Sequence, residues 1–293
     1  MLLSNIKIKR ESLLRELKLT VLALSTAMFA MWFLFYAYMN NTIKNYVIEN
    51  MEQVSSQIIS ELSRSFLQLE EVSFALSEEE TVIQLMNAED SIEFHNSASA
   101  VEKVLEGLSV DTSFMDNLIF YNEKEMFYRF SGSISNTGIQ RMMNIISKDE
   151  IGRHIKIRLD DTNYVGYVAN IGENNCYFGK IVMLTDENDI YRLFQQLAGN
   201  EDMKIALAAD GKVIVCSEET MIGRETKELM INNSYIIHKQ VGFTPFELLV
   251  SYEDSNNEMS YIFLAAMIVM AAILLLILSM FLHFWKKKFF APL

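Results

Sequence analysis

The sequence has few of the residues from which enzymes build catalytic and metal sites. It contains four histidines and two cysteines among 293 residues, and no histidine has a cysteine, another histidine or an acid at the spacing of a zinc site. The GxSxG nucleophile elbow, the P-loop and the dinucleotide-binding fingerprint are also missing. The sequence therefore predicts that the chain is not an enzyme and that it has no catalytic residues, metal or cofactor.

Basic residues are scarce across the middle of the chain. Residues 39–258 contain 17 Lys and Arg against 36 Asp and Glu, which gives a net charge of −19. An acidic surface of this kind disfavours nucleic acid and anionic lipid as partners of this segment. The simplest interpretation is that the charge keeps an exported domain in solution.

Two long apolar runs flank the acidic segment. They cover residues 19–39 and 260–285, and each has the roughly 20 residues that a helix needs to cross about 30 Å of hydrocarbon. Five Lys and Arg precede the first run, and Lys286, Lys287 and Lys288 follow the second. Basic flanks mark the cytoplasmic side of a span. We therefore expect a cell-membrane protein with two transmembrane helices, cytoplasmic ends at 1–18 and 286–293, and an extracytoplasmic segment 40–258.

The first apolar run has a second interpretation, as a cleaved signal peptide. Its apolar core is longer than the usual length of about 7–15 residues, and no small-x-small cleavage site follows it. Aromatic residues from Trp32 to Tyr38 crowd its outer end, as in an interfacial belt. We expect an uncleaved anchor.

The two cysteines, Cys176 and Cys216, both fall in the extracytoplasmic segment. That compartment permits a disulfide, but sequence does not give the geometry of the pair. Two free thiols buried in strands are the interpretation that we favour.

The start of the extracytoplasmic segment has a helical pattern. Residues 42–86 contain neither glycine nor proline, and apolar residues recur every three or four positions, for example at Val54, Ile58, Leu62 and Phe66. This spacing predicts an amphipathic helix. We expect a helical stalk over 42–110, interrupted near residues 77–80, whose apolar stripe is buried by the domain or by a second copy of the chain.

Strand signals begin at Asp116 and fall into two groups. Residues 117–122 and 126–130 have the pattern of a hairpin, and further strands are expected at 154–159, 163–169 and 177–184. This group defines a distal unit at 116–198. A membrane-proximal unit at 203–254 follows, in which Asp210-Gly211 is a strong hairpin signal. The expected fold class is α+β, with a long stalk helix and two antiparallel sheet units.

Several of these segments resemble the double Cache sensor domain of bacterial transmembrane receptors. Residues 205–217, IALAADGKVIVCS, followed by Ile222-Gly223, are similar to the strand, Asp-Gly, strand, Ser, Ile-Gly pattern of the membrane-proximal Cache unit. Residues 179–184 resemble the join between the two units. Residues 244–250 resemble the last strand, although Phe246 stands where the family commonly has Trp. The resemblance covers residues 42–258 and implies two PAS-like sheets between two transmembrane helices.

The last eight residues, KKKFFAPL, resemble the entrance to a HAMP linker. Pro292 suits this position because proline is tolerated in the first turn of a new helix. The resemblance implies the sensory half of a longer receptor, similar to a two-component sensor histidine kinase or a membrane-anchored AraC-type regulator. A complete protein without an output domain is the alternative.

Aromatic residues and one guanidinium in the distal unit are the candidates for ligand binding, since they can form apolar walls and grip a carboxylate. Arg129 and Tyr121 loosely resemble the tyrosine–arginine pattern of amino-acid-binding Cache domains, but that pattern includes a Trp and residues 40–258 contain none. The alternative is that the tyrosines pack a sheet and Arg129 pairs with an acid. The candidate residues are Tyr121, Tyr128, Arg129, Tyr164, Tyr167 and Tyr177.

Four aspartates, Asp160, Asp161, Asp186 and Asp189, match no calcium loop. We expect them to be turn residues and helix caps.

These observations together predict a sensing input module. It would act as a homodimer in the lipid bilayer, bind an unidentified extracytoplasmic small molecule, and relay the change through Tyr252, Tyr261, the second span and Pro292 to a cytoplasmic output domain. A protein-interaction or scaffold protein without a small-molecule ligand is the main alternative. A tethered hydrolase is a third, although the sequence has no nucleophile–base pair to support it.

Overall fold

The computed structural model describes residues 2–107, 114–146, 152–173, 176–198, 203–231, 235–252 and 265–273, with isolated positions 275, 276, 279, 280 and 283. The chain divides into two compact units. The first contains Met1–Glu49 and Asp254–Leu293, and the second contains Asn50–Glu253.

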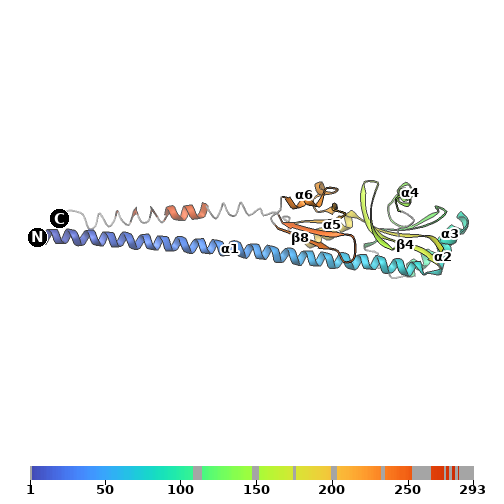
Figure 1. The fold of residues 1–293 in the computed structure, drawn as a ribbon, viewed down its shortest axis with the longest axis horizontal. Coiled ribbons are helices and arrows are strands. Elements are labelled where there is room, and N and C mark those ends of the chain that lie inside the picture. Colours follow the sequence, from blue (N-terminus) through green and yellow to red (C-terminus); the bar gives the residue numbers. More distant parts are fainter. Residues whose placement is uncertain are drawn as a thin grey trace. The chain divides into compact units, whose positions relative to one another are not determined.

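The first unit contains the beginning of a long helix, α1 (Leu2–Ser77), which is unbroken over 76 residues (Figure 1). From Leu19 onward, α1 is long and apolar enough to cross a membrane, judged by its length and composition. Large apolar side chains such as Leu22, Met31 and Phe33 are exposed there. Residues 265–273 are also helical, but much of the second expected span, 260–285, lies outside the described residues.

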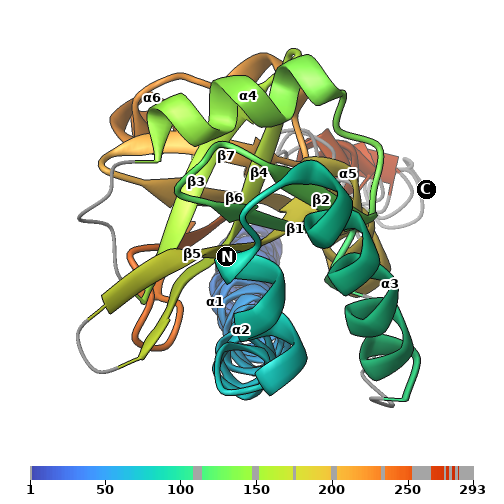
Figure 2. The same ribbon diagram turned by 90° about the vertical axis from the view of Figure 1, so that its right-hand side faces the viewer.

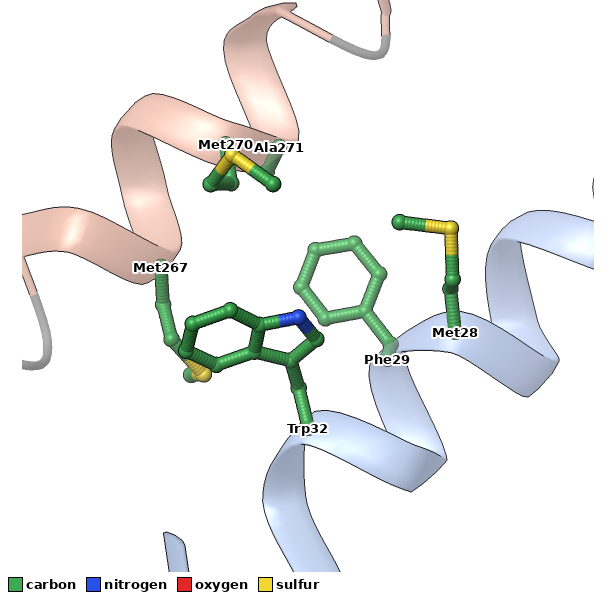
Figure 3. Close-up of a pocket in the computed structure, with 6 residues that line it drawn as sticks. All are labelled: Met28, Phe29, Trp32, Met267, Met270 and Ala271. Carbon is green, nitrogen blue, oxygen red and sulfur yellow. The ribbon is translucent and has the colours of Figure 1, made fainter. Parts of the chain in front are cut away.

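The two helical segments of the first unit face each other through apolar side chains. Met28, Phe29 and Trp32 of α1 lie opposite Met267 and Met270 (Figure 3). The space left between them is about 20 Å³, which holds little more than one water-sized group. This contact is therefore helix packing and not a ligand site.

In the second unit, α1 buries the apolar stripe that its sequence predicts. Val54, Ile58, Leu62 and Phe66 are all buried, because positions three or four apart lie on one face of a helix. The helical region continues as α2 (Glu80–Asn87) and α3 (Ser91–Gly107), so the expected break near residues 77–80 is confirmed.

A five-stranded antiparallel sheet, the distal sheet, follows in the order β2-β1-β5-β4-β3. The helix α4 (Asn136–Ile145) covers one face of this sheet, and α1 and α2 lie on the other (Figure 2). Every residue of β1 is buried, as expected for a strand covered on both faces. The strands are β1 (Asn117–Asn122), β2 (Phe127–Ser131), β3 (Arg153–Leu159), β4 (Thr162–Glu173) and β5 (Cys176–Asp186).

The helix α5 (Glu187–Ala198) leads to a four-stranded antiparallel sheet, the proximal sheet, with the order β7-β6-β9-β8. The turn between β6 and β7 has positive φ at both Asp210 and Gly211, which the expected two-residue hairpin requires. Two short helices, η2 (Glu219–Met221) and α6 (Thr226–Ile231), follow β7, and the sequence did not predict them. The strands are β6 (Met203–Ala209), β7 (Lys212–Cys216), β8 (Tyr235–Gln240) and β9 (Glu247–Tyr252).

Polar contacts join the parts of the second unit. The Lys156 ammonium in β3 pairs with Asp210 at 2.6 Å and donates to the Ala209 carbonyl at 3.0 Å, so it links the two sheets. Lys239 in β8 pairs with Glu52 of α1. The stalk part of α1 and both sheets therefore form one body.

The expected α+β class, with a long N-terminal helix and two antiparallel sheets, is confirmed. Cys216 is a buried free thiol, as we expected. The side chain of Cys176 lies outside the described residues.

Candidate ligand-binding site

A cleft of about 310 Å³ opens on the α4 side of the distal sheet. Its volume falls at the lower end of the range of about 300–1,000 Å³ that is usual for small-molecule sites. The end of β1 and the turn after it form one wall, α4 forms the opposite wall, and β5 forms the floor. The lining residues are Tyr121, Asn122, Glu123, Glu125, Gln140, Met143, Asn144, Ile146, Tyr177 and Lys180.

The wall made by α4 is fixed at its N-terminus. Ser135 caps the helix by accepting a hydrogen bond from the Gly138 amide at 2.9 Å, which satisfies one of the free N–H groups of the first turn. Asp160, in the turn between β3 and β4, accepts from the Ser135 hydroxyl at 2.9 Å and pairs with Arg141 at 3.2 Å. These contacts tie α4 to the sheet.

The wall made by the β1–β2 turn is also held firmly. The buried Asn122 side chain accepts hydrogen bonds from the amides of Lys124 and Met126, both at 3.0 Å. Its own amide donates to the Met86 carbonyl of α2 at 3.4 Å. The turn can therefore present Glu123 and Glu125 at the rim of the cleft in a defined position.

Lys180 forms part of the floor and is the main electrostatic feature of the cleft. Its side chain is almost fully buried, with only 1% of the residue exposed. It lies directly across from Tyr121 in the β1–β5 ladder. Burying an ammonium group is costly unless anions or hydrogen-bond acceptors surround it. Lys180 therefore has acceptors around it in the folded chain, and it brings a positive charge to the floor of the cleft.

Tyr177 supplies a hydroxyl that stays protonated. Burial, together with the nearby charge of Glu123, raises the pKa of Tyr177 to about 12. At physiological pH the phenol is thus a neutral group that can donate one hydrogen bond.

The structure brings together two of the six predicted ligand residues, Tyr121 and Tyr177. Tyr164 lies on the same face of the sheet but belongs to the hydrophobic core beneath α4. Arg129 is exposed and donates to the Ile134 carbonyl.

The other two predicted residues project from the opposite face of the distal sheet. Tyr128 pairs with Phe120, next to the cleft residue Tyr121 in β1, so the alternation along the strand turns it away from the cleft. Tyr167 contacts the ring of His154, with centroids 5.1 Å apart. The register of the strands therefore does not allow all six residues to line one wall of the cleft.

Sequence reasoning missed Lys180, Gln140 and Asn144. For Lys180 a signal was available, since it is the one cation in β5, is followed by four apolar residues, and shares its face with Val182 and Leu184. Gln140 and Asn144 had no comparable signal, because their role depends on how α4 crosses the sheet.

Among the expected relay residues, Tyr252 ends β9. It is buried and pairs with Met203 on one side and Tyr235 on the other. Tyr261 and Pro292 lie outside the described residues.

Three carboxylates gather at the other end of the distal sheet. Oxygens of Asp116, Asp186 and Asp189 lie within 4.8 Å of one another. Asp186 accepts from the amides of Asn188 at 2.7 Å and Asp189 at 3.2 Å, so it caps α5 as predicted. Burial, followed by a hydrogen bond between the Asp116 and Asp189 carboxyl groups, raises the pKa of Asp116 to about 7.

When Asp116 is protonated, its carboxyl group can donate a hydrogen bond to Asp189. Asp116 also accepts from the Asp186 amide at 2.8 Å, so a cation at this place would compete with N–H donors that already occupy the carboxylates. Among the described residues, these three carboxylates are the only group close enough together to resemble a set of metal ligands. The predicted turn positions Asp160 and Asp161 both have positive φ.

No protein-family model matches the sequence, and no curated protein is significantly similar to it in sequence. The chain is similar to the solved structure of an extracellular ligand-binding receptor from Desulfohalobium retbaense, with 11% identity over 69% of this chain and a TM-score of 0.45. It spans 40% of the length of that protein.

Two further similar structures are sensor domains of known receptors. The ligand-binding domain of the Pseudomonas aeruginosa PAO1 amino acid chemoreceptor PctB, in complex with L-Arg, matches with 10% identity over 73% of this chain and 96% of that one, at a TM-score of 0.48. The sensor domain of the V. cholerae histidine kinase DctB matches with 11% identity over 72% of this chain and 96% of that one, at a TM-score of 0.45.

The similar structures are extracellular ligand-binding domains of chemoreceptors and sensor domains of kinases, which is the resemblance that the sequence predicts. At identities near 10% and TM-scores below 0.5, this likeness concerns the arrangement of elements. It carries no conclusion about ligand or output, and the HAMP and AraC resemblances stay predictions.

Proposed function

We propose that the chain is the input module of a transmembrane receptor and that it senses an extracytoplasmic small molecule. The observation that carries this proposal is the cleft beneath α4, with the buried Lys180 in its floor. The apolar part of α1 supports a membrane anchor.

The chemistry of the cleft favours a small ligand with one anionic group. Lys180 would bind the anion, and charge-assisted hydrogen bonds are among the stronger polar contacts. Tyr121 and Tyr177 would cover its apolar part, and Gln140 on α4 would offer an amide. Glu123 and Glu125 at the rim would repel a ligand that carries several negative charges.

The contacts between the two sheets support a route for the signal. A ligand that drew α4 and the distal sheet together would act on β3, from which Lys156 reaches the β6–β7 turn. Strand β9 pairs with β6 and ends at Tyr252. From there the route would continue through Tyr261 and the second span to Pro292 and an output domain. The ligand can shift this equilibrium only by its difference in affinity for two states.

Thermal unfolding of the full chain in nanodiscs tests the ligand class. A panel of small monocarboxylates and small amines would be screened, and a ligand present at 100 times its Kd stabilises by about 2.7 kcal/mol. For a unit of this size that corresponds to roughly 5–10 °C in Tm. We expect shifts with carboxylates, and shifts with amines alone would contradict the proposal.

The matched variants are Lys180→Met and Lys212→Met. Lys180→Met keeps the length of the side chain but removes its charge, so affinity for a carboxylate that binds should fall by roughly 10- to 100-fold. Lys212 is exposed on β7, and Lys212→Met should bind as the parent does. If Lys180→Met and Lys212→Met bound the carboxylate with equal affinity, the ligand would bind at a site other than the cleft that contains Lys180.

An interaction protein is the alternative, and one observation favours it. Leu67 and Phe74 of α1 are 53% and 63% exposed and lie seven residues apart, which places them on one face of the helix, away from its buried stripe. Another extracytoplasmic protein, or the second copy of the chain that the sensing module also predicts, would cover such a face. Sedimentation of the full chain with Phe74→Glu tests it, and an unchanged molecular mass would exclude this face from a dimer.

A further inference from the structure

His154 occupies the place where the stalk helix and the two sheets meet. It pairs with Tyr167 across the β3–β4 ladder. Its ring lies 5.3 Å from that of Phe66 in α1 and 6.4 Å from that of Phe246, the residue before β9. The rings of Phe66 and Phe246 stack with centroids 5.0 Å apart. We call these four rings the junction cluster.

The environment of His154 favours its neutral form. Its Nδ1 atom is buried and has no hydrogen-bond partner among the residues that the structure describes. Burial lowers the pKa of His154, and Glu70 of α1 together with the Gly166 carbonyl opposes this effect in part. A proton on Nδ1 would therefore bring an unsatisfied donor and a charge among aromatic rings.

Among the residues that the structure describes, few other charged groups face the imidazole. Arg153 precedes it on β3, and Tyr167 is the titratable group from β4. Across a neighbouring cavity, Lys156 and Asp210 pair with each other at 2.6 Å. The turn before β9 and the end of α4 contribute the uncharged residues Thr244, Pro245, Ile145 and Ile146.

Two cavities border the junction cluster, and both are lined by His154 and Pro245. One is about 250 Å³ and lies between β3 and the proximal sheet, and the other is about 570 Å³ and reaches Glu70 of α1. Phe243, in the same turn as Pro245, is fully exposed. The turn between β8 and β9 thus has space beside it, and water can enter there once the rings separate.

We propose that His154 is a proton-sensitive latch that holds the stalk helix, the distal sheet and strand β9 together. The neutral imidazole keeps the junction cluster packed, and protonation opens it along the two cavities. Since Phe246 directly precedes β9, a proton acts on that strand without a ligand in the distal cleft. The module then responds to mild acid as a second input, at a site separate from Lys180.

The direction of the pH dependence follows from the lowered pKa. His154 binds a proton less readily when the junction cluster is packed, which is the closed state, than when it is open. The neutral imidazole therefore stabilises the closed state, and this stabilisation is complete above the ordinary histidine pKa of about 6.5. This contribution is lost as the pH falls through the lower pKa of the closed state. Between these two values, the ratio of open to closed junction rises by up to about tenfold per pH unit.

Hydrogen exchange of the full chain in nanodiscs tests the latch. Amides of residues 62–70 and 241–248 would be followed at pH 7.5 and pH 5, with rates corrected for the intrinsic effect of pH. We expect a several-fold increase in corrected exchange at pH 5 for the unaltered chain and none for His154→Phe, which keeps an aromatic ring but cannot titrate. His95→Gln, at an exposed histidine of α3, should behave as the unaltered chain.

Two results would overturn the latch. One is an unaltered chain whose corrected exchange is the same at both pH values, and the other is a pH step that survives in His154→Phe. Nuclear magnetic resonance of the labelled histidines gives a second readout that needs no variant to fold. His154 should titrate below the ordinary histidine pKa of about 6.5, and titration at or above that value would also refute the proposal.

Discussion

Replacing Asp116 by asparagine is expected to stabilise the second unit above neutral pH and to leave its stability at pH 4 nearly unchanged. Asp116 lies directly before β1, and burial together with a hydrogen bond to Asp189 raises its pKa from 3.8 to about 7. Because the folded state holds the proton more tightly than the unfolded state, the carboxyl group lowers stability as the pH rises from about 4 to about 7. Above about pH 7 the stability lost through ionisation of Asp116 no longer increases.

The size of the effect follows from the pKa and from the partial exposure of the group. A carboxyl group with this pKa, if fully buried, would lose about 4 kcal/mol on ionisation in the folded state. Asp116 is only partly buried, so screening by solvent reduces the expected loss to about 1–2 kcal/mol. The neutral amide of Asp116→Asn avoids this loss and still accepts the hydrogen bond from the Asp186 amide.

Calorimetry of the full chain in nanodiscs between pH 4 and pH 8 measures this difference. At pH 8 the melting temperature of the second unit should rise by roughly 3–6 °C in Asp116→Asn. Asp161→Asn is the control, because the Asp161 side chain is 98% exposed and its replacement should change stability by less than about 0.5 kcal/mol. Melting curves of Asp116→Asn and the parent that stay parallel from pH 4 to pH 8 would refute the reasoning.

Two further predictions concern packing. A Cβ on Gly166 would overlap the Met183 carbonyl of the neighbouring strand, so Gly166→Ala should unfold the distal sheet or lower its Tm by 10 °C or more, on the order of 3 kcal/mol. Gly107→Ala, where a Cβ meets nothing within 4 Å, should be neutral or stabilising. Ile58→Ala should cost about 2–5 kcal/mol because Ile58 is fully buried, whereas Leu67→Ala, on the exposed side of α1, should cost under about 1 kcal/mol. Denaturant unfolding distinguishes each pair, and equal losses within a pair would contradict the burial described above.

The elements of the fold could be predicted because their signals are local. The spacing of Val54, Ile58 and Leu62 specifies which stripe of α1 is buried, and Asp210-Gly211 specifies a hairpin turn with positive φ. The helix α6 could not be predicted in the same way, since six residues are too few to establish a helical period.

The candidate site was only partly predictable because it depends on register. Aromatic residue type selected Tyr121 and Tyr128 equally, yet the β1–β2 pairing places them on opposite faces. A shift of one residue in the register of a strand exchanges its two faces. Residue type alone therefore does not show which of these two tyrosines faces the cleft. The cluster of Asp116 with Asp186 and Asp189 was hidden for a related reason, since Asp116 precedes Asp186 by 70 residues and only the sheet brings them together.

The place of β9 in the proximal sheet limits the kind of movement that can reach Tyr252. This strand is paired along its length with β6 on one side and β8 on the other, and its residues from Leu248 to Tyr252 are buried. Sliding β9 by one residue would break both ladders and turn its buried side chains to the wrong faces. A displacement that arrives at Tyr252 is therefore a tilt or rotation of the four strands together, and β9 does not act as a piston between fixed neighbours.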